Sequence, residues 1–115
     1  VIDAERSLDW GKNTNLYFEK NSFTIGYAEK IKLNKIFDTL IKMTGNSVII
    51  TGFADKSGDK NYNAYLSEKR AKAVQNYFLS KGIDKKRLII NFMGDSESDS
   101  INQADRKVVV DIISH

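Results

Sequence analysis

An acid and a base lie at fixed spacing in the stretch of this chain that is best suited to binding chemistry. Asp55 lies in a turn with Gly58, directly after an apolar run, and Arg70 follows in an amphipathic stretch. A loop between a strand and a helix leaves backbone N–H groups unpaired at its rim, which suits ligand binding. A carboxylate pairs with an ammonium group and a guanidinium with a carboxylate, so the two residues predict a site for an amino-acid-like ligand.

Each of these residues also has a purely structural interpretation. An aspartate before a nearby glycine, such as Asp55, is typical of a turn in which the side chain bonds to its own backbone. Arg70 could be a solvated helix residue, and Asn63 could stabilise its own turn. The residue types alone leave these alternatives open.

The periodicity of the apolar residues predicts the elements that must position the site. A 3.6-residue period indicates helices and runs of strand formers indicate strands, so we expect the order strand, helix, strand, helix, strand, strand. This order predicts an α/β sandwich, with helices packed on one mixed sheet. The expected strands span residues 16–19, 48–51, 87–93 and 108–113, and the expected helices span 28–44 and 67–81. Residues 94–105 lack periodicity and predict a mobile surface loop.

The second helix matters most, because its start decides where Arg70 lies. Ser67 can cap this helix after a short helical turn at residues 60–65, with Gly82 at its end. Arg70 would then lie in the first turn, where its charge opposes the helix dipole by roughly 0.3–1 kcal/mol and favours a ligand anion. We expect Asp55 and Arg70 to face ligand more than core. The strand at 48–51 should be buried on both faces, and strands joined through a helix should be parallel.

The spacing of the site residues resembles a known motif. The run Gly52-Phe-Ala-Asp-x-x-Gly58, followed by Asn63-x-x-Leu-Ser-x-x-Arg70-Ala-x-x-Val74, resembles the OmpA-like peptidoglycan-binding domain family, which includes MotB-type domains. The resemblance covers nearly all of the chain except residues 1–14, which we expect to be an N-terminal extension or linker before a domain at 15–115. It implies the family's βαβαββ-type fold, with the helices on one face of the sheet.

The resemblance also implies a function and a set of site residues. In the family, the residue matching Asp55 takes the ammonium group, and the residue matching Arg70 takes the carboxylate, of diaminopimelate in the peptidoglycan stem peptide. Ligand contacts are further implied for Asn63, for Arg106 near the end of the chain and for Asn21 after the first strand. The implied protein is a periplasmic, non-catalytic module that anchors an outer-membrane or envelope protein of a Gram-negative bacterium to the cell wall.

The chain departs from the family pattern at three places around this site. Phe53-Ala54 replaces His-Thr, Ile101-Asn102 replaces Gly-Arg, and Asp105-Arg106-Lys107 replaces Asn-Arg-Arg. An ion pair between Asp105 and Arg106 would compete with the ligand. An OmpA-like interaction or dimerisation module with weakened peptidoglycan binding therefore stays open as the alternative function.

Composition excludes several other classes of protein. The 115 residues fit one domain, and 41% hydrophobic with 29% charged residues favours a soluble globular fold. No cysteine is present and the single histidine is the terminal His115, so thiolate chemistry and serine–histidine catalysis are not expected. Asp55 and Asp59 lie in a lysine-rich polar loop, which disfavours a hydrolase couple. We expect no cofactor and no metal.

The distribution of charge and of apolar residues bears on the partners. The net charge of +3 comes from lysines scattered among acids, whereas nucleic-acid binding calls for a clustered basic face. No apolar run approaches the ~20 residues that cross a bilayer, so we expect membrane association only through missing parts of a parent protein. The expected partner is diaminopimelate-containing peptidoglycan, and the sequence does not specify an oligomeric state.

Overall fold

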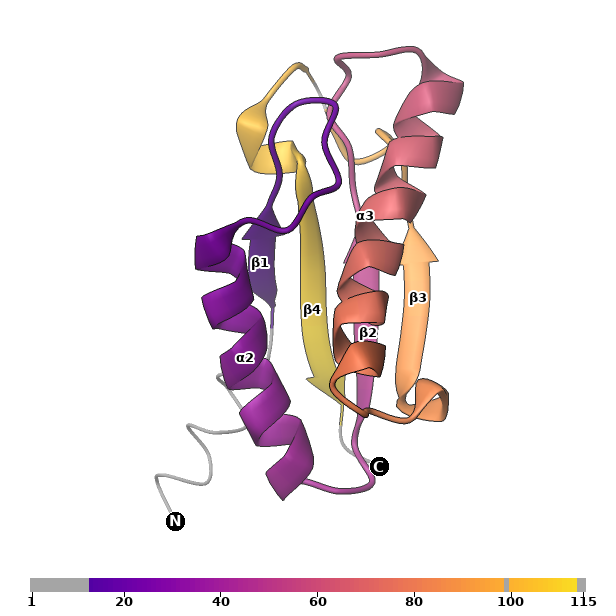
Figure 1. Cartoon of the computed structure of the whole chain (residues 1–115). Helices are drawn as coiled ribbons and strands as arrows, with labels where there is room; N and C mark the ends of the chain where they lie inside the picture. The colour runs from indigo at the N-terminus through magenta and orange to yellow at the C-terminus, as the bar shows by residue number, and fades with distance from the viewer. Residues whose placement is uncertain (1–12, 99, 114–115) are drawn as a thin grey trace.

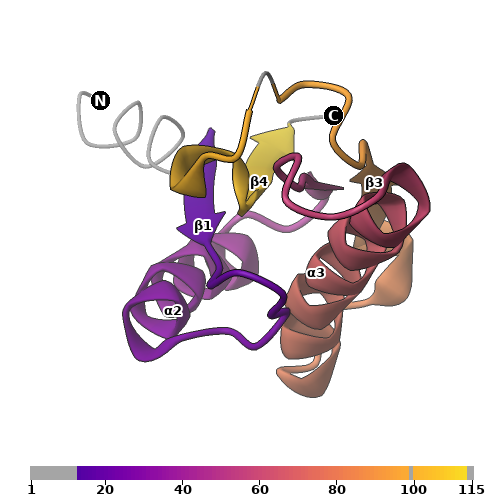
Figure 2. The same ribbon diagram turned by 90° about the horizontal axis from the view of Figure 1, so that it is seen from above.

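The computed structural model describes residues 13–98 and 100–113, so the prediction for residues 1–14 lies almost wholly outside the described part of the chain. Two helices and a four-stranded sheet form two layers, with both helices on the same face of the sheet (Figures 1 and 2). The predicted arrangement is therefore confirmed. The elements are β1 (Thr14–Tyr17), α2 (Tyr27–Lys42), β2 (Ser47–Gly52), α3 (Lys60–Ser80), the 3₁₀ turn η1 (Lys85–Arg87), β3 (Leu88–Phe92), the 3₁₀ turn η2 (Gln103–Asp105) and β4 (Lys107–Ile113).

The sheet is mixed, with the spatial order β1-β4-β2-β3. β4 pairs antiparallel with both β1 and β2, and β3 pairs parallel with β2. The expected parallel pairing therefore holds for the two strands that α3 connects. β1 and β2 also run in the same direction, but β4 lies between them.

The core lies between the helices and one face of the sheet. α2 contributes its 3.6-period stripe, and β2 and β4 contribute alternate residues. Each fully buried aliphatic side chain stabilises the fold by about 1.5–3 kcal/mol. The buried residues of these elements include Leu33, Ile36, Leu40, Val48, Ile50, Val108 and Val110. The prediction that strand 48–51 is buried on both faces is wrong: Ile49 and Thr51 are half-buried, because no helix covers their face of the sheet.

α3 begins earlier than the sequence predicts. It is one continuous helix from Lys60, and the carboxylate of its N-cap Asp59 accepts a 2.8 Å hydrogen bond from the Tyr62 N–H. Ser67 is not a cap. Its hydroxyl donates to the Ala64 carbonyl (2.8 Å) and accepts from the Gly94 N–H (2.9 Å), which ties the helix to the loop after β3. Arg70 therefore lies well inside the helix, and the expected opposition to the helix dipole does not apply.

None of the described helices is long and apolar enough to cross a membrane. The predicted surface loop at 94–105 is also more ordered than expected. Ser98 is buried, and its hydroxyl lies 2.7 Å from the Ser100 carbonyl and 3.0 Å from the Asp105 carboxylate. The Asn102 N–H also donates to Asp55 (3.0 Å) and the Lys56 N–H to the Ser100 carbonyl (3.3 Å), so the described part of this loop lies against the segment that follows β2.

The close approach of α3 to β2 depends on Gly52. A Cβ atom at this position would lie 2.0 Å from the Ser67 carbonyl oxygen. We predict that Gly52→Ala lowers the free energy of unfolding by about 1–3 kcal/mol or more, because the helix must move away from the sheet. The control is Gly26→Ala, where the added Cβ meets nothing closer than 3.6 Å. Chemical denaturation of both variants is the measurement, and equal stability of the two would contradict this packing argument.

Candidate functional site

Three charged side chains from distant parts of the sequence meet at the carboxyl end of β2. Asp55 follows β2, Arg70 projects from α3, and Arg106 precedes β4. Nη1 of Arg106 lies 2.9 Å from Oδ2 of Asp55, and the charge of Asp55 acts on Arg70. We call these three residues the charged cluster. It contains the two residues on which the sequence prediction rests most heavily.

The Asp55 carboxylate is fully engaged by its own chain. Oδ1 accepts from the Ser57 N–H (3.2 Å), and this bond is the turn interpretation that the sequence left open. Oδ2 accepts from the Asn102 N–H (3.0 Å) as well as from Arg106. Burial alone would raise the pKa of Asp55, but the hydrogen bonds from Ser57, Arg106 and Asn102 together hold that pKa below its ordinary value. Asp55 is therefore ionised at neutral pH although it is only 1% exposed.

Arg70 is buried completely, with a relative exposure of 0%. Its guanidinium donates to three backbone carbonyls: Nε to Ser22 (2.8 Å), Nη1 to Phe53 (3.2 Å) and Nη2 to Glu19 (3.1 Å). Its Cζ also lies 5.4 Å from the centre of the Phe18 ring. Through these hydrogen bonds Arg70 connects the loop after β1 to the end of β2.

The burial of Arg70 contradicts its interpretation as a solvated residue and the expectation that it faces ligand more than core. The side chain is not a solvated helix residue, and neither Arg70 nor Asp55 faces open space more than the protein interior. Burial lowers the pKa of the Arg70 guanidinium to about 10, while the charge of Asp55 opposes this shift and that of Arg106 adds to it. The group stays protonated at neutral pH, so two cations share one carboxylate and the charged cluster carries excess positive charge.

Asn63 is buried beside the charged cluster but contacts other groups. Its Nδ2 donates to the Gly58 carbonyl and to Oδ2 of Asp95, each at 2.9 Å, whereas its Oδ1 accepts no hydrogen bond from the described residues. The hydrogen bond from Asn63 lowers the pKa of Asp95. In the structure, Asn63 stabilises the turn before α3, as its structural interpretation predicts.

Asn21 lies on the surface of the loop that Arg70 holds. Its backbone has a left-handed φ of 58°, a conformation that asparagine tolerates better than most residues. The residues that accept from Arg70, Glu19 and Ser22, lie on either side of it. The structure therefore places Asn21 at the rim of the site and not inside the charged cluster.

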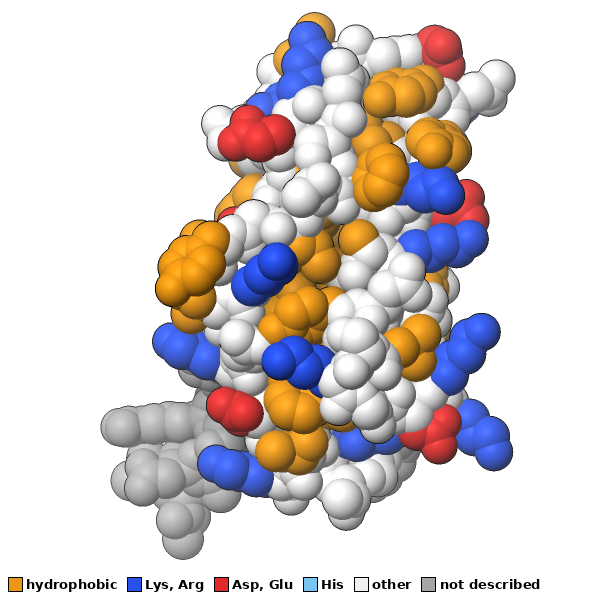
Figure 3. Space-filling view, viewed as in Figure 1, with side chains coloured by type: hydrophobic (Ala, Val, Ile, Leu, Met, Phe, Trp, Pro, Cys, Tyr) orange, Lys and Arg blue, Asp and Glu red, His pale blue; other side chains and the backbone are white. Residues whose placement is uncertain are grey.

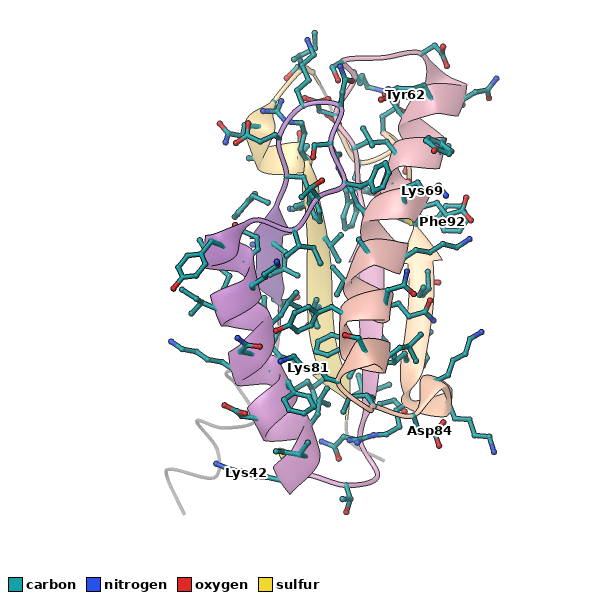
Figure 4. The ribbon with its side chains drawn as sticks, viewed as in Figure 1. Lys42, Tyr62, Lys69, Lys81, Asp84 and Phe92 are labelled. Carbon is teal, nitrogen blue, oxygen red and sulfur yellow. The ribbon has the colours of Figure 1, made fainter. Side chains whose placement is uncertain are left out.

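Sequence reasoning missed two side chains near Arg70. Phe18 lies under the guanidinium, and Tyr62 is close enough to contribute to the pKa of Arg70. Tyr62 lies near the amino end of α3 (Figure 4) and is 37% exposed, so one of its faces is open to solvent. Both were hidden because aromatic residues in strand and helix patterns are most simply explained as core residues.

The neighbourhood of Arg106 also differs from the prediction. Arg106 does not pair with Asp105, whose carboxylate accepts from the Ser98 hydroxyl. Instead its Nη1 pairs with Asp55 and its Nε donates to the Phe18 carbonyl at 3.3 Å. The carbonyl groups on either side of Asn21 and the carbonyl of Phe18 are thus held by the two arginines of the charged cluster.

A groove of about 650 Å³ lies next to the charged cluster, and Thr51, Phe53 and Asn91 are among its lining residues. Lys107 lies above the Phe53 ring, with Nζ 5.6 Å from its centre. On the face that carries the helices, lysine and arginine side chains are spread out, with acids between them (Figure 3). No group of three or more potential metal-ligating residues occurs in the described part of the chain.

The sequence model of the OmpA family matches residues 17–110, and the chain belongs to this family. Outer membrane protein A of Buchnera aphidicola subsp. Schizaphis graminum is 36% identical over 88 residues, which cover 75% of this chain and 25% of the relative. The chain thus spans about a quarter of the length of this curated relative.

Two solved structures illustrate the shared fold. The peptidoglycan-associated lipoprotein from Burkholderia pseudomallei matches with a TM-score of 0.80 and 19% identity, over 89% of this chain and 91% of that protein. The cell wall anchor of the T6SS from Pseudomonas aeruginosa matches with a TM-score of 0.69 and 24% identity, over 86% and 76% of the two chains. At these identities the likeness concerns the fold alone.

The contacts of Arg70 predict a large effect on stability. Arg70→Ala should lower the free energy of unfolding by about 2–4 kcal/mol, because three backbone carbonyls lose their donor. Lys72→Ala on the same helix removes only an exposed pair with Glu68 and should cost no more than about 0.5 kcal/mol. Urea denaturation measures both. A loss below about 1 kcal/mol for Arg70→Ala would restore the expectation that this side chain contributes little to the fold.

The lowered pKa of Asp55 predicts acid sensitivity. A carboxyl whose pKa is lower in the folded than in the unfolded chain stabilises the fold above its unfolded pKa, and this stabilisation is lost as pH falls through the folded pKa. Asp55→Asn should therefore cost about 1.5–3 kcal/mol at pH 7, and the difference from the unsubstituted chain should shrink below about pH 4.

Denaturation curves between pH 2 and pH 7 measure this acid sensitivity. Asp38→Asn, which removes an exposed carboxylate of α2, is the matched control and should change the curves less. A difference between the unsubstituted chain and Asp55→Asn that is constant over this pH range would contradict the role given to the Asp55 charge.

Proposed function

We propose that this domain binds peptidoglycan without catalysis, through the diaminopimelate residue of the stem peptide. The observation that carries the proposal is the charged cluster, in which one carboxylate, paired with Arg106, lies near two guanidinium groups. The free end of diaminopimelate carries one carboxylate and one ammonium group. Its carboxylate would compensate the excess positive charge, and its ammonium would pair with Asp55.

The electrostatics of Arg70 favour a carboxylate ligand in particular. The pKa of this guanidinium is lowered by burial, and the charge of Arg106 adds to the effect. The negative charge of a bound carboxylate would oppose both effects, so binding the ligand would stabilise the charged form of Arg70. A guanidinium offers five N–H donors, of which the three carbonyls occupy only part, so donors remain for a ligand.

Access to the charged cluster requires a local rearrangement. Asp55 and Arg70 are buried, and the loop of residues 19–22 and the segment around Asn102 lie against them. The ammonium group of the ligand would take the place of Arg106 or of the Asn102 N–H at the Asp55 carboxylate. Asn21 would then contact the ligand from the rim, and Asn63 would keep the turn before α3 in place.

The biological role that follows is attachment of a larger envelope protein to the cell wall. One solved structure with this fold is a peptidoglycan-associated lipoprotein and another is a cell wall anchor. The curated relative with 36% identity is an outer membrane protein. By this proposal the domain lies in the periplasm, and other parts of its parent protein hold it to the membrane.

One observation favours the second candidate, an OmpA-like module for protein interaction. The Asp55 carboxylate already has three partners within its own chain, so a ligand ammonium must displace one of them. A pull-down on purified sacculi separates the candidates. Retention supports peptidoglycan binding, and its absence supports the interaction module.

The separate roles of the two charges predict ligand discrimination. Asp55 could pair with the ammonium of lysine or of diaminopimelate, but only diaminopimelate has a carboxylate next to that ammonium for Arg70. We therefore expect stronger retention on sacculi cross-linked through diaminopimelate than on lysine-type walls. Arg70→Lys should remove most of this preference, because an ammonium cannot reproduce the bidentate fork.

The chain contains a matched control for Arg70→Lys. Arg87 also donates to three backbone carbonyls, those of Asn46, Leu40 and Met43, but it does so at the opposite end of the sheet. Arg87→Lys should therefore cost comparable stability and leave the retention on both walls unchanged. Equal retention of the unsubstituted chain on the two wall types would contradict the role given to Arg70.

A further inference from the structure

β3 is an outer strand of the sheet, and no described segment lies beyond it (Figures 1 and 2). A strand in this position presents backbone donors and acceptors that can pair with another strand. We infer that β3 is a pairing edge for a second copy of this chain, so that two four-stranded sheets join into one continuous sheet. This inference is independent of the proposed peptidoglycan site.

The register with β2 shows which backbone groups of β3 point outward. The Met93 N–H donates to the Gly52 carbonyl at 2.9 Å, so the N–H and C=O groups of Ile89 and Asn91 also point to β2. The same groups of Leu88, Ile90 and Phe92 point away from the sheet. Among them only the Leu88 N–H has a partner, the Lys85 carbonyl of η1.

These groups allow an antiparallel pair with its two-fold axis at Ile90. In antiparallel pairing, outward-pointing residues of the two strands face one another and exchange hydrogen bonds. A two-fold axis at Ile90 places Ile90 opposite its own copy and Leu88 opposite Phe92. This register pairs both groups of Ile90 and joins the Leu88 C=O to the Phe92 N–H, while the Phe92 C=O stays without a donor because the Leu88 N–H is bonded to Lys85.

The charges that flank β3 support the same arrangement. Lys85 and Lys86 are exposed before the strand, next to the exposed Asp84. The exposed Glu97 follows the strand, as does Asp95, whose carboxylate already pairs with Lys56 at 3.6 Å. Antiparallel pairing about Ile90 brings the basic end of each copy to the acidic end of the other. Such self-complementarity is what a two-fold interface requires, and parallel pairing would bring like charges together.

β3 also lacks the devices that usually protect an edge. Its sequence, Leu-Ile-Ile-Asn-Phe, contains no charged residue, and the whole chain contains no proline. Ile89 and Phe92 are 42% and 48% exposed, and Figure 4 shows Phe92 at the end of β3 beside α3. Natural edge strands are normally protected by lysine, proline or a bulge.

The helix layer is compatible with this pairing. α3 lies over β2 and β3, and strands in a sheet are about 4.8 Å apart. The axes of the two α3 helices would then be about 10 Å apart across the two-fold axis, within the usual range for packed helices. The joined sheet therefore leaves room for both helices without separating them by a gap.

A short edge interface is expected to be weak, so the test is made over a concentration range. Sedimentation equilibrium from about 10 μM to 1 mM should show a monomer–dimer equilibrium for the unsubstituted chain. Ile89→Lys should weaken it at least tenfold, because it places a cation near its own copy across the axis. Tyr17→Lys, an exposed substitution on the outer strand β1, is the control and should leave the equilibrium unchanged. A chain that stays monomeric at 1 mM overturns the inference.

A disulfide test reports on the register itself. The chain has no cysteine, so Ile90→Cys gives one thiol that faces its own copy at a Cα separation of about 5.5 Å, a distance a disulfide can span. This variant should form a covalent dimer on mild oxidation, whereas Tyr17→Cys should not. A dimer that resists Ile89→Lys, or equal cross-linking of the two cysteine variants, would place the contact elsewhere and overturn the inference.

Discussion

The structure around the site depends on a single buried arginine. Arg70 projects from α3 and donates to the carbonyls of Glu19 and Ser22 after β1 and of Phe53 after β2. A buried charge of this kind is costly unless every contact is made, so the loop and the strand end must adopt the conformations that provide those carbonyls. Through these contacts one side chain joins the helix layer, the loop and the sheet at the place where Asp55 lies.

This dependence means that structure and binding cannot be separated cleanly at Arg70. The same guanidinium that holds the loop at residues 19–22 would accept the ligand carboxylate, with Arg106 and Asp55 completing the charge balance. An arginine is well suited to both tasks because its five donors form a rigid fork that can serve several acceptors at once. Loss of binding in an Arg70 variant is therefore informative only beside a variant such as Arg87→Lys, which perturbs comparable contacts at the other end of the sheet.

Much of the fold could be predicted from local patterns. The helix over Tyr27–Lys42 follows from its apolar stripe and from Gly45, and the strands follow from runs of β-branched residues. The sequence predicts a start of α3 that is too late, because Ser67 is as good an N-cap residue as Asp59 and its tertiary contact with Gly94 is not visible in the sequence. The incomplete burial of Ile49 follows from the positions of both helices, which periodicity does not specify.

The sequence predicts which residues form the charged cluster better than it predicts their contacts. Residue spacing indicates that Asp55 and Arg70 are close, but burial and hydrogen-bond partners depend on segments distant in sequence, such as residues 19–22 and Arg106. Asn63 and Asn21 are near the charged cluster without contacting it, a distinction that a motif cannot make.

The central claim is that the charged cluster receives the amino-acid end of diaminopimelate, and an NMR titration of the ¹⁵N-labelled chain tests it most directly. A muropeptide with diaminopimelate should shift the Nε–H signal of Arg70 and the amide signals of Ser57 and Asn102, which bond to Asp55. The lysine counterpart should shift them much less. Unchanged signals up to millimolar ligand, or equal shifts with both muropeptides, would contradict the claim.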